Sequence, residues 1–324
     1  MKVARQLAQL VAPAKPVCVA IGVFDGVHLG HQSILQDLKQ HAEKLGASAV
    51  AVTFDRHPLA VVDPERAPRL IQTLGQRLRT LEHLALDAAW VIEFDAAFSR
   101  LTGEEFIALL VQGFGRLSSI HVGQHFHFGY RRTGTVALLR QLEGRFGFVT
   151  RALPPCLQNG QAVSSTRIRQ AIRHGDLHTV DRMLGRRYAV GGRVVIGDGR
   201  ARRLGFPTAN LDVAGLTLPP TGVYAARALW AGQTAHAVVN IGRRPTIDSA
   251  NQVVGVEAHL LDRQIDLYGH DLELVLANRL RDERTFPNLD ALKHQIAKDI
   301  VAARASLEKE IELDASRPTL SPMS

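Results

Sequence analysis

The sequence predicts an α/β chain: a parallel sheet with helices on both faces, then a compact antiparallel β-barrel or β-sandwich domain with a terminal helix. Three observations lead to this prediction. Apolar, β-branched runs alternate with runs of helical period up to about residue 184. After Gly185, short β-rich runs separated by Gly, Pro, Asn and Asp replace that alternation. The length of 324 residues suits about two domains.

Strands and helices alternate along the first half. Strands are expected at Val17–Gly22, Ser48–Phe54, Ala89–Phe94, Ser119–Val122 and Phe148–Leu153. Helices are expected at Leu29–Leu45, Leu74–Leu86, from Thr102 onward and at Thr135–Phe146. Glu105 follows Thr102 by three residues, which is the signature of a capping box at a helix start. This alternation favours a parallel sheet.

The second half follows two short expected helices, Ser164–His174 and Leu177–Leu184, which close a first domain spanning residues 1–184. Strands are expected at Arg193–Ile196, Val223–Trp230, His236–Ile241, Val256–Leu261 and Leu272–Ala277. A final helix is expected at Leu289–Leu313, so the second domain spans residues 185–314. Residues 315–324 are expected to form a flexible tail.

Composition excludes several classes of protein. No uninterrupted apolar run reaches about 18 residues, and Lys15 and Pro16 break the apolar stretch near the N-terminus, so neither a membrane span nor a signal peptide is expected. Two cysteines, Cys18 and Cys156, are too few for a disulfide framework or a zinc site. We therefore expect a cytoplasmic protein.

Charge points to small anionic substrates. The 39 basic and 31 acidic residues give a net charge of +8, and the basic residues are scattered along the chain rather than grouped in runs. Aromatic residues make up only 6% of the chain, whereas a nucleic-acid binder is expected to interleave aromatic and basic residues. We expect small-molecule substrates, no nucleic-acid or membrane partner, and a monomer or weak homo-oligomer.

The first candidate site follows the first strand, in the stretch from Gly22 to His31. It contains His28-Leu29-Gly30-His31, an H-x-G-H motif at a strand-to-helix junction. Ligands of open parallel sheets bind at the carboxyl ends of strands, and a helix N-terminus there attracts phosphate. Both imidazoles share one face of a helical turn and could stabilise charge on a transferring phosphate. Alternatively, one histidine caps the helix and the other is a core polar group.

H-x-G-H at this position is typical of the nucleotidyltransferase and class I synthetase superfamily, so it predicts adenylyl transfer from ATP. A second segment, Ser164-Ser165-Thr166-Arg167-Ile168-Arg169, opens a helix. Its hydroxyls, exposed N–H groups and guanidinium groups suit the β- and γ-phosphates. The alternative is a plain serine cap with a solvated basic face.

The second domain holds another candidate site. Thr208 and Asn210 alternate on an extended segment, so their oxygens face one side and suit Mg²⁺ bound to ATP phosphates. The glycine-rich turn at Gly197, Gly199 and Arg200 precedes them and could fold over the phosphates. Glu257, within a strand pattern, could act as a general base. The alternatives are a turn entering a strand and an outward-facing carboxylate.

These motifs, in this order, resemble the bacterial bifunctional riboflavin kinase/FMN adenylyltransferase family, also called FAD synthetase, from about Val17 to about Ile311. The motifs that carry the resemblance are Gly22–His31, Val163–Arg169, Leu204–Asn210, Gly222–Ala225, Asn240–Thr246, Glu257 with its strand, and Leu280–Phe286. The resemblance implies a Rossmann-like nucleotidyltransferase domain that adenylylates FMN to FAD with release of pyrophosphate. It also implies a six-stranded antiparallel barrel with a C-terminal helix that phosphorylates riboflavin to FMN.

The resemblance also implies residue roles. His28, His31 and Glu257 match catalytic positions. Nucleotide-binding positions in the first domain are Gly22, Phe24, Asp25, Gly30, Ser164, Ser165, Thr166 and Arg169. Those in the second domain are Gly197, Gly199, Arg200, Gly205, Thr208 and Asn210, and the last two also match Mg²⁺ ligands. Flavin-binding positions are Phe54, His57, Pro58, His125 and Phe128 in the first domain and Arg281 in the second.

Two positions depart from the family pattern. His125 stands where an Asp or Asn is usual, and Arg56 stands where a proline is usual. We expect the adenylylation step to survive these changes, since an imidazole still forms hydrogen bonds.

Two other classes of protein would share some of these features. A short class I aminoacyl-tRNA synthetase should carry a Lys-Met-Ser-Lys-Ser-like loop late in the chain, which this sequence lacks. A non-catalytic flavin- or RNA-binding protein derived from an enzyme should have lost His28, His31, Thr208, Asn210 or Glu257, and all five are present.

Overall fold

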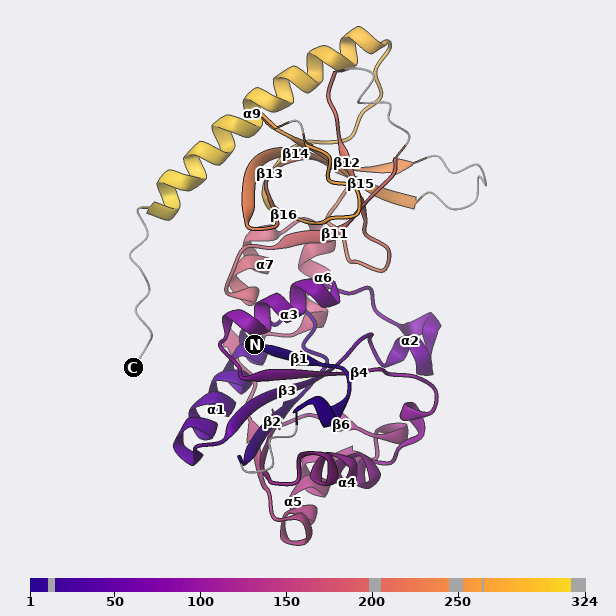
Figure 1. Ribbon diagram of the computed structural model, residues 1–324. Helices are drawn as coiled ribbons and strands as arrows, with labels where there is room; N and C mark the ends of the chain where they lie inside the picture. Colours follow the sequence, from indigo (N-terminus) through magenta and orange to yellow (C-terminus); the bar gives the residue numbers. More distant parts are fainter. Residues whose placement is uncertain (11–14, 198–204, 245–252, 264, 316–324) are drawn as a thin grey trace. The chain divides into compact units, whose positions relative to one another are not determined.

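The computed structural model describes residues 1–10, 15–197, 205–244, 253–263 and 265–315. Two compact units make up the chain (Figure 1): an N-terminal unit of Met1–Arg169 with Arg182–Gly185, and a barrel unit of Gln170–Asp181 with Arg186–Ser324. The division therefore falls within helices α6 (Ser165–His174) and α7 (Leu177–Leu184). The boundary expected between residues 184 and 185 stays a prediction. The tail expected at 315–324 lies outside the described residues from 316 onward.

The N-terminal unit is built on a six-stranded sheet in the order β1-β4-β3-β2-β5-β8, in which every neighbouring pair is parallel. The strands are β1 (Lys2–Ala4), β2 (Val17–Ile21), β3 (Ser48–Phe54), β4 (Ala88–Ile92), β5 (Leu117–Gly123) and β8 (Val149–Leu153). The chain runs outward from β2 to β3 and β4, and then returns to the other side of β2 for β5 and β8. The strand order thus reverses between β2 and β5, which is where such sheets bind ligands.

Helices cover both faces of this sheet, as predicted (Figure 1). They are α1 (Leu29–Leu45), α3 (Leu74–His83), α4 (Gly103–Phe114) and α5 (Val136–Phe146). Alternate strand residues feed two cores, because successive side chains of a strand point to opposite faces. Cys18 and Ala20 pack with α1 and α3 in one core, whereas Val17 and Val19 pack with α4 and α5 in the other.

The helix ends show which local signals acted. Thr102 and Glu105 form the predicted capping box of α4, with the Thr102 amide 2.8 Å from a Glu105 carboxylate oxygen. Helix α3 ends at His83, three residues before the predicted end, and Ala85 has a φ of +56°, which is incompatible with a continuing helix.

Short elements complete the N-terminal unit, and the sequence patterns did not predict them. They are η1 (Leu7–Leu10), α2 (Leu59–Val62), η2 (Pro64–Arg66), η3 (Phe98–Arg100), η4 (Tyr130–Arg132), β6 (His127–Phe128), β7 (Gly134–Thr135), β9 (Leu157–Gln158) and β10 (Gln161–Ala162). Edge strand β1, of three residues, is likewise too short to show a period.

The barrel unit contains a closed barrel in the order β11-β12-β15-β14-β13-β16, with antiparallel neighbours throughout. Its strands are β11 (Ala189–Val195), β12 (Ala209–Asp212), β13 (Gly222–Trp230), β14 (Gln233–Arg244), β15 (Val253–Leu260) and β16 (Asp271–Arg281). Helix α9 (Leu289–Ala315) packs its Ala303 and Leu307 against Val223, Val238 and Ala277 on the outside of the barrel (Figure 1). The predicted fold class is confirmed.

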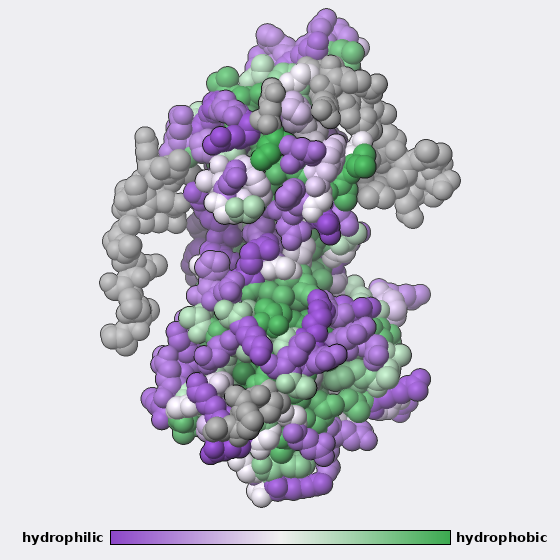
Figure 2. All heavy atoms as spheres, in the orientation of Figure 1, coloured by the Kyte–Doolittle hydropathy of each residue, from purple (hydrophilic) through white to green (hydrophobic). Residues whose placement is uncertain are grey.

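The surface is mainly hydrophilic on the face shown in Figure 2, and hydrophobic side chains are more frequent there on the N-terminal unit than on the barrel unit. Among the described residues, no helix is both long enough and apolar enough to span a bilayer.

Candidate active sites in the two units

The H-x-G-H motif lies at the carboxyl end of β2, beside the point where the strand order reverses. The chain between β2 and α1 makes a tight turn, in which Phe24, Gly26 and Val27 have positive φ angles of 51°, 83° and 37°. Val27 is a β-branched residue, for which positive φ is costly, so the surrounding packing must hold this turn in place. The turn positions His28 at the N-cap of α1 and His31 in its first turn.

His28 and His31 are brought together as predicted. Their rings stack with centroids 3.6 Å apart, and the Phe24 ring packs edge-on against His31 at 5.3 Å. The Nδ1 atom of His28 accepts a hydrogen bond from the His31 amide, so the proton of a neutral His28 ring lies on Nε2. The proposed alternative, in which one histidine caps the helix, is therefore correct for His28.

His31 lies in an environment that keeps its ring neutral. Burial lowers its pKa well below 6.5, and the nearby charges of His28 and Arg77 lower it further. Its Nδ1 atom is buried and has no hydrogen-bond partner among the described residues. Since buried polar atoms are normally paired, an unpaired nitrogen at the end of a parallel strand indicates a position that a ligand completes.

Gly30 leaves room for the close approach of the His28 ring. A Cβ atom at this position would stand 3.2 Å from His28 Cε1 and 3.3 Å from its Nδ1. Gly22 meets a similar limit, because a Cβ atom there would lie 3.0 Å from the Phe24 ring. These two glycines let the two aromatic side chains fold back over the turn.

Asp25 ties the turn to the rest of the unit. Its carboxylate accepts hydrogen bonds from the backbone amides of Ile71 and Gln72 and from Arg169 Nη2, which is 2.6 Å away. Its backbone oxygen accepts a bond of 2.9 Å from the Ser165 hydroxyl. The predicted phosphate-binding segment and the H-x-G-H turn are thus joined through this one residue.

At the start of α6, some side chains form hydrogen bonds within the protein and others face solvent. Ser164 Oγ accepts a bond from the Arg167 amide, which is a helix cap, and Thr166 is exposed. Arg169 also donates from Nε to the Arg69 carbonyl oxygen at 2.7 Å. The alternative of a serine cap is therefore present in the structure, alongside the link from Ser165 to Asp25.

Arg77 of α3 was missed by sequence reasoning. Its buried guanidinium donates to the carbonyl oxygens of Val23 and Phe54, which follow or end strands β2 and β3. Burial lowers its pKa to about 10, against the opposing effect of Asp25 and Asp55, so it remains charged at neutral pH. A buried arginine in a predicted helix gives no sequence signal, since its spacing matches that of an ordinary amphipathic face.

The segment after β3 contributes less directly. Phe54 packs in the core, with its ring 5.4 Å from that of Phe94, and is 8% exposed. His57 is half-buried and its Nδ1 accepts from the Leu59 amide at 3.2 Å, while Pro58 precedes α2. Burial lowers the pKa of His57, and Arg169 lowers it further, so His57 lies within the electrostatic reach of the α6 start.

The segment after β5 carries the departure from the family pattern. His125 is exposed and lies 3.0 Å from the Gln124 amide nitrogen, measured from its Nε2. Phe128 is buried and packs on Phe126, and Gly134 must be glycine because a Cβ there would lie 2.7 Å from the Phe128 ring. The His125 side chain is therefore accessible to solvent, whereas Phe128 has a packing role in the structure.

The barrel unit brings Asn210 and Glu257 together. Asn210 of β12 pairs directly with Glu257 of β15, and Glu257 pairs in turn with Asn240 of β14. Residues opposite each other on antiparallel strands share a face, with Cβ atoms about 5 Å apart. The three polar side chains form a row on the outer face, because Asn240 lies two residues from Val238 on the same face of β14, and Val238 packs under α9. Sequence reasoning missed Asn240 as a site residue.

Glycines make room beside this row. A Cβ atom on Gly197 would lie 2.1 Å from Asn210 Nδ2, so only glycine fits there. A Cβ atom on Gly242 would lie 2.5 Å from Glu283 Oε1 and 3.0 Å from Asn240 Nδ2. Glu283 is thus a second carboxylate beside the row that sequence reasoning did not single out. Gly199 and Arg200 lie outside the described residues.

A pocket of about 480 Å³ opens beside the same strands of the barrel. Thr208 and Asn210 line it together with Gly205 and Ala258, and Ile265, Leu267 and Tyr268 supply an apolar wall. It therefore combines oxygen ligands at one side with an aromatic and aliphatic surface at the other.

Arg281 lies beside Phe286, which lines a second pocket of the barrel unit. Its guanidinium binds Asp299 of α9 in a fork, with Nε–Oδ1 and Nη2–Oδ2 distances of 2.9 and 2.7 Å. It also lies 5.7 Å from the ring centre of Phe286, which lines a pocket of about 550 Å³ with Arg284, His294 and Lys298 among others. Arg281 is thus oriented by a buried carboxylate rather than free to move.

Comparison with known proteins agrees with the two-unit fold. An FAD synthetase family model matches residues 11–167, and a riboflavin kinase family model matches residues 184–307. The bifunctional riboflavin kinase/FMN adenylyltransferase of Escherichia coli K12 is 37% identical over 94% of this chain and 97% of its own length. The protein of the same description from Pseudomonas fluorescens is 38% identical over 94% of this chain and 97% of its own.

The chain belongs to the bifunctional riboflavin kinase/FMN adenylyltransferase family. The family and the transferase class predicted from the sequence are therefore confirmed. A crystal structure described as a macrolide-efflux protein from Streptococcus pneumoniae also matches, with a TM-score of 0.76 and 27% identity over 93% of this chain and 98% of that one. That description concerns the other protein, and what the match adds here is agreement in fold.

Proposed function

We propose that the two reactions of this riboflavin kinase/FMN adenylyltransferase are divided between the two sites. The N-terminal unit adenylylates FMN at His28 and His31, and the barrel unit phosphorylates riboflavin at Asn210 and Glu257. ATP is a substrate of both reactions, and FMN is the product of one and a substrate of the other. The observation that carries this division is the presence of a separate polar constellation in each unit, each within its own matched family domain.

Adenylyl transfer needs charge stabilisation on the α-phosphate rather than a covalent intermediate on the protein. We assign this role to the ring protons of His28 and His31, with the N-terminus of α1 adding backbone N–H groups. The α6 start, with Ser165, Thr166 and Arg169, faces the remaining phosphates. Asp25 acts in this assignment by positioning Arg169 and the turn, since its carboxylate is already engaged by protein donors.

FMN would occupy the carboxyl ends of β3 and β5 in this unit. His57 and Pro58 follow the former and His125 follows the latter. Because an imidazole can donate or accept a hydrogen bond, His125 replaces the usual carboxylate or amide as a polar contact. Phe54 and Phe128 support these segments from the core.

Phosphoryl transfer to riboflavin needs a base, positioned phosphates and neutralised charge. Glu257 is assigned as the base that accepts the proton of the attacking ribityl hydroxyl, with Asn210 and Asn240 beside it fixing its orientation. The Thr208 hydroxyl and the Asn210 amide oxygen suit Mg²⁺, because both are hard oxygen donors two residues apart at one pocket. When bound, Mg²⁺ would neutralise charge on the ATP phosphates.

The pockets suit the two kinase substrates. The pocket near Thr208 offers an apolar wall with Tyr268 for the adenine and oxygen ligands for the phosphate end. The pocket near Phe286 is rich in cations and lies beside Arg281, which suits the flavin and its growing phosphate. The glycine-rich turn with Gly197 and Arg200 is proposed to close over the ATP phosphates.

The domain bounds, cellular location and partners are also proposed here. We propose domains at residues 1–184 and 185–314, a cytoplasmic location, no nucleic-acid partner, and a monomer or weak homo-oligomer.

The test is a time course of the purified chain with riboflavin, ATP and Mg²⁺, in which riboflavin, FMN and FAD are separated by chromatography. We expect FMN first and FAD later, and no turnover of either flavin without Mg²⁺. Accumulation of FMN with no FAD above an enzyme-free control would contradict the assignment of the N-terminal site, and absence of FMN would contradict that of the barrel site.

A further inference from the structure

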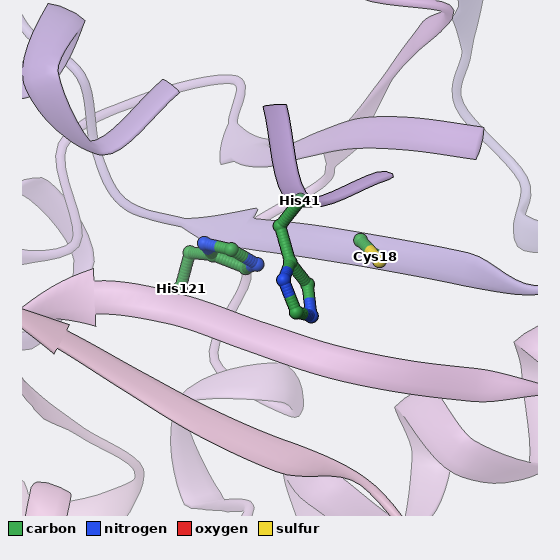
Figure 3. Close-up of side chains that lie close together, drawn as sticks. All are labelled: Cys18, His41 and His121. Atoms are coloured by element: carbon green, nitrogen blue, oxygen red, sulfur yellow. The ribbon is translucent and has the colours of Figure 1, made fainter. Parts of the chain in front are cut away.

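Three side chains with metal-binding atoms converge in the N-terminal unit, on the face of the sheet that α1 covers. They are Cys18 from β2, His121 from β5 and His41 from α1, and Figure 3 shows the three side chains close together. One ligand atom from each lies within 4.8 Å of the other two. Strand register explains the approach: Cys18 pairs with Ser119 on β5, and His121 lies two residues further along on the same face.

His121 is already oriented as histidines in metal sites are. Its Nδ1 lies 2.8 Å from Asp37 Oδ2, and Arg151 holds that carboxylate through contacts of 2.7 and 2.8 Å. An ionised carboxylate only accepts, so Nδ1 carries the ring proton and Nε2 presents its lone pair. Metal-ligating histidines usually donate their second N–H to a carboxylate in this way.

The lone pair of His121 Nε2 faces the Ser119 hydroxyl. Ser119 Oγ lies 2.8 Å from it and also interacts with the Cys18 thiol. The serine hydroxyl can rotate away or turn its oxygen toward an ion, because it both donates and accepts. The hydroxyl can therefore give way to an ion or become one of its ligands.

The size of the cluster suits a small ion after modest closure. Three atoms that all lie within 4.8 Å of one another have a common point no more than about 2.8 Å from each, whereas Zn–N and Zn–S bonds are about 2.1 and 2.3 Å. Cys18 and His121 are fully buried within the sheet, whereas His41 is partly exposed on α1. His41 can therefore supply most of the inward movement, and its exposed side gives the ion an entry path.

We propose that Cys18, His41 and His121 form a structural Zn²⁺ site, with the Ser119 hydroxyl or a water as fourth ligand and Asp37 as the positioning residue of His121. One thiolate with two imidazoles is a ligand set that favours Zn²⁺ over Mg²⁺ or Ca²⁺. On binding, the Cys18 thiol loses its proton to water and a Zn–S bond forms, with no change of oxidation state. The ion would join β2, β5 and α1, away from the H-x-G-H turn.

This inference departs from the sequence-based expectation that two cysteines are too few for a zinc site. That expectation counted cysteines and missed the two histidines, because neither histidine has a ligand spacing to Cys18 that marks a zinc motif. The fold brings together residues 18, 41 and 121, which are far apart in the chain.

The test uses the full chain, freed of metal with a chelator and titrated with Co²⁺ as a spectroscopic substitute for Zn²⁺. We expect one equivalent of Co²⁺ to produce a thiolate charge-transfer band and the visible bands of tetrahedral Co²⁺, and stoichiometric Zn²⁺ to remove both. Cys18→Ser should abolish the charge-transfer band, and Asp37→Asn should weaken Co²⁺ affinity about 10- to 100-fold.

Matched variants keep the result interpretable. Cys156→Ser removes the other thiol and should leave the spectrum unchanged. His41→Gln changes a partly exposed residue, so the protein should remain folded by circular dichroism while Co²⁺ affinity falls at least 100-fold. The proposal is overturned if Co²⁺ gives no thiolate band, or if Cys18→Ser or a folded His41→Gln protein binds Co²⁺ with unchanged spectrum and affinity.

Discussion

Arg169 and Asp25 form an ion pair, with 2.6 Å between Arg169 Nη2 and Asp25 Oδ2, and both side chains are at least nine-tenths buried. The pair joins the first turn region of α6 to the loop between β2 and α1, which are 144 residues apart in the chain. Asp25 also receives two backbone amides from residues 71 and 72. This relationship fixes the predicted phosphate-binding segment relative to the histidine pair.

Replacing Arg169 with leucine should destabilise the N-terminal unit by about 3–5 kcal/mol, because it leaves the Asp25 carboxylate buried without its cation. Chemical denaturation followed by circular dichroism measures the loss. The control is Arg145→Gln, which breaks the exposed ion pair with Glu104 and should cost about 1 kcal/mol or less. Equal effects of the two changes would contradict a structural role for the buried pair.

Gly30→Ala should impair FAD formation and leave FMN formation unchanged. The new Cβ would press on the His28 ring at 3.2 Å, and moving a catalytic group by a fraction of an ångström to 1 Å can cost up to about 100-fold in rate. Gly144→Ala in α5 is the matched control, since no atom lies within 4 Å of its added Cβ. It should stabilise the helix by up to about 1 kcal/mol and change neither rate. FAD formation at the wild-type rate in Gly30→Ala would contradict a role of His28 in the adenylylation step.

His31 should remain neutral at pH values where an ordinary histidine is protonated. Burial, His28 and Arg77 all lower its pKa well below 6.5. The unfolded chain therefore binds more protons than the folded one once the pH falls below 6.5, so this residue's contribution to the free energy of unfolding declines with falling pH.

Imidazole chemical shifts measured by NMR between pH 8 and pH 5 check this directly, with the His31 signal assigned from its loss in His31→Asn. We expect no midpoint near 6.5 for that signal. A midpoint at 6.5 would show that the ring is open to solvent and would contradict the buried, ligand-ready geometry.

Asp299→Ala should impair the kinase by loosening Arg281. The carboxylate holds the guanidinium fork and also accepts from Gln295 Nε2 at 2.7 Å. We expect a rise in KM for riboflavin larger than the fall in kcat, with FAD formation from added FMN unchanged. Glu308→Gln, at an exposed site on the same helix, is the control. An unchanged KM for riboflavin in a stable Asp299→Ala protein would contradict the placement of Arg281 at the flavin site.

Much of the fold could be predicted from sequence, because the period of apolar residues differs between the two halves. Strands such as Ser48–Phe54 and helices such as Leu29–Leu45 were predicted to the residue. Strand β12 was missed because it has only four residues. The extent of β14 was underestimated because polar Gln233 and Thr234 precede its apolar run and Gly242, Arg243 and Arg244 follow it.

Site prediction succeeded where residues are neighbours in the chain and failed where the fold assembles them. His28 and His31 are three residues apart, so one helical turn brings them together. Arg77, Asn240 and Asp299 each act through a residue distant in sequence, and no local pattern distinguishes them from ordinary helix or strand positions. Asp25 was singled out as a nucleotide contact, whereas the structure engages its carboxylate with Arg169 and two backbone amides.

The division of the two reactions between two sites is tested most directly by His31→Asn and Glu257→Gln, assayed with riboflavin, ATP and Mg²⁺, separately and mixed. We predict that His31→Asn makes FMN but no FAD, and that Glu257→Gln makes no FMN from riboflavin but makes FAD from added FMN. Mixing the two proteins should restore FAD formation from riboflavin. FAD formation by His31→Asn at the wild-type rate, or FMN formation by Glu257→Gln at the wild-type rate, would contradict the account.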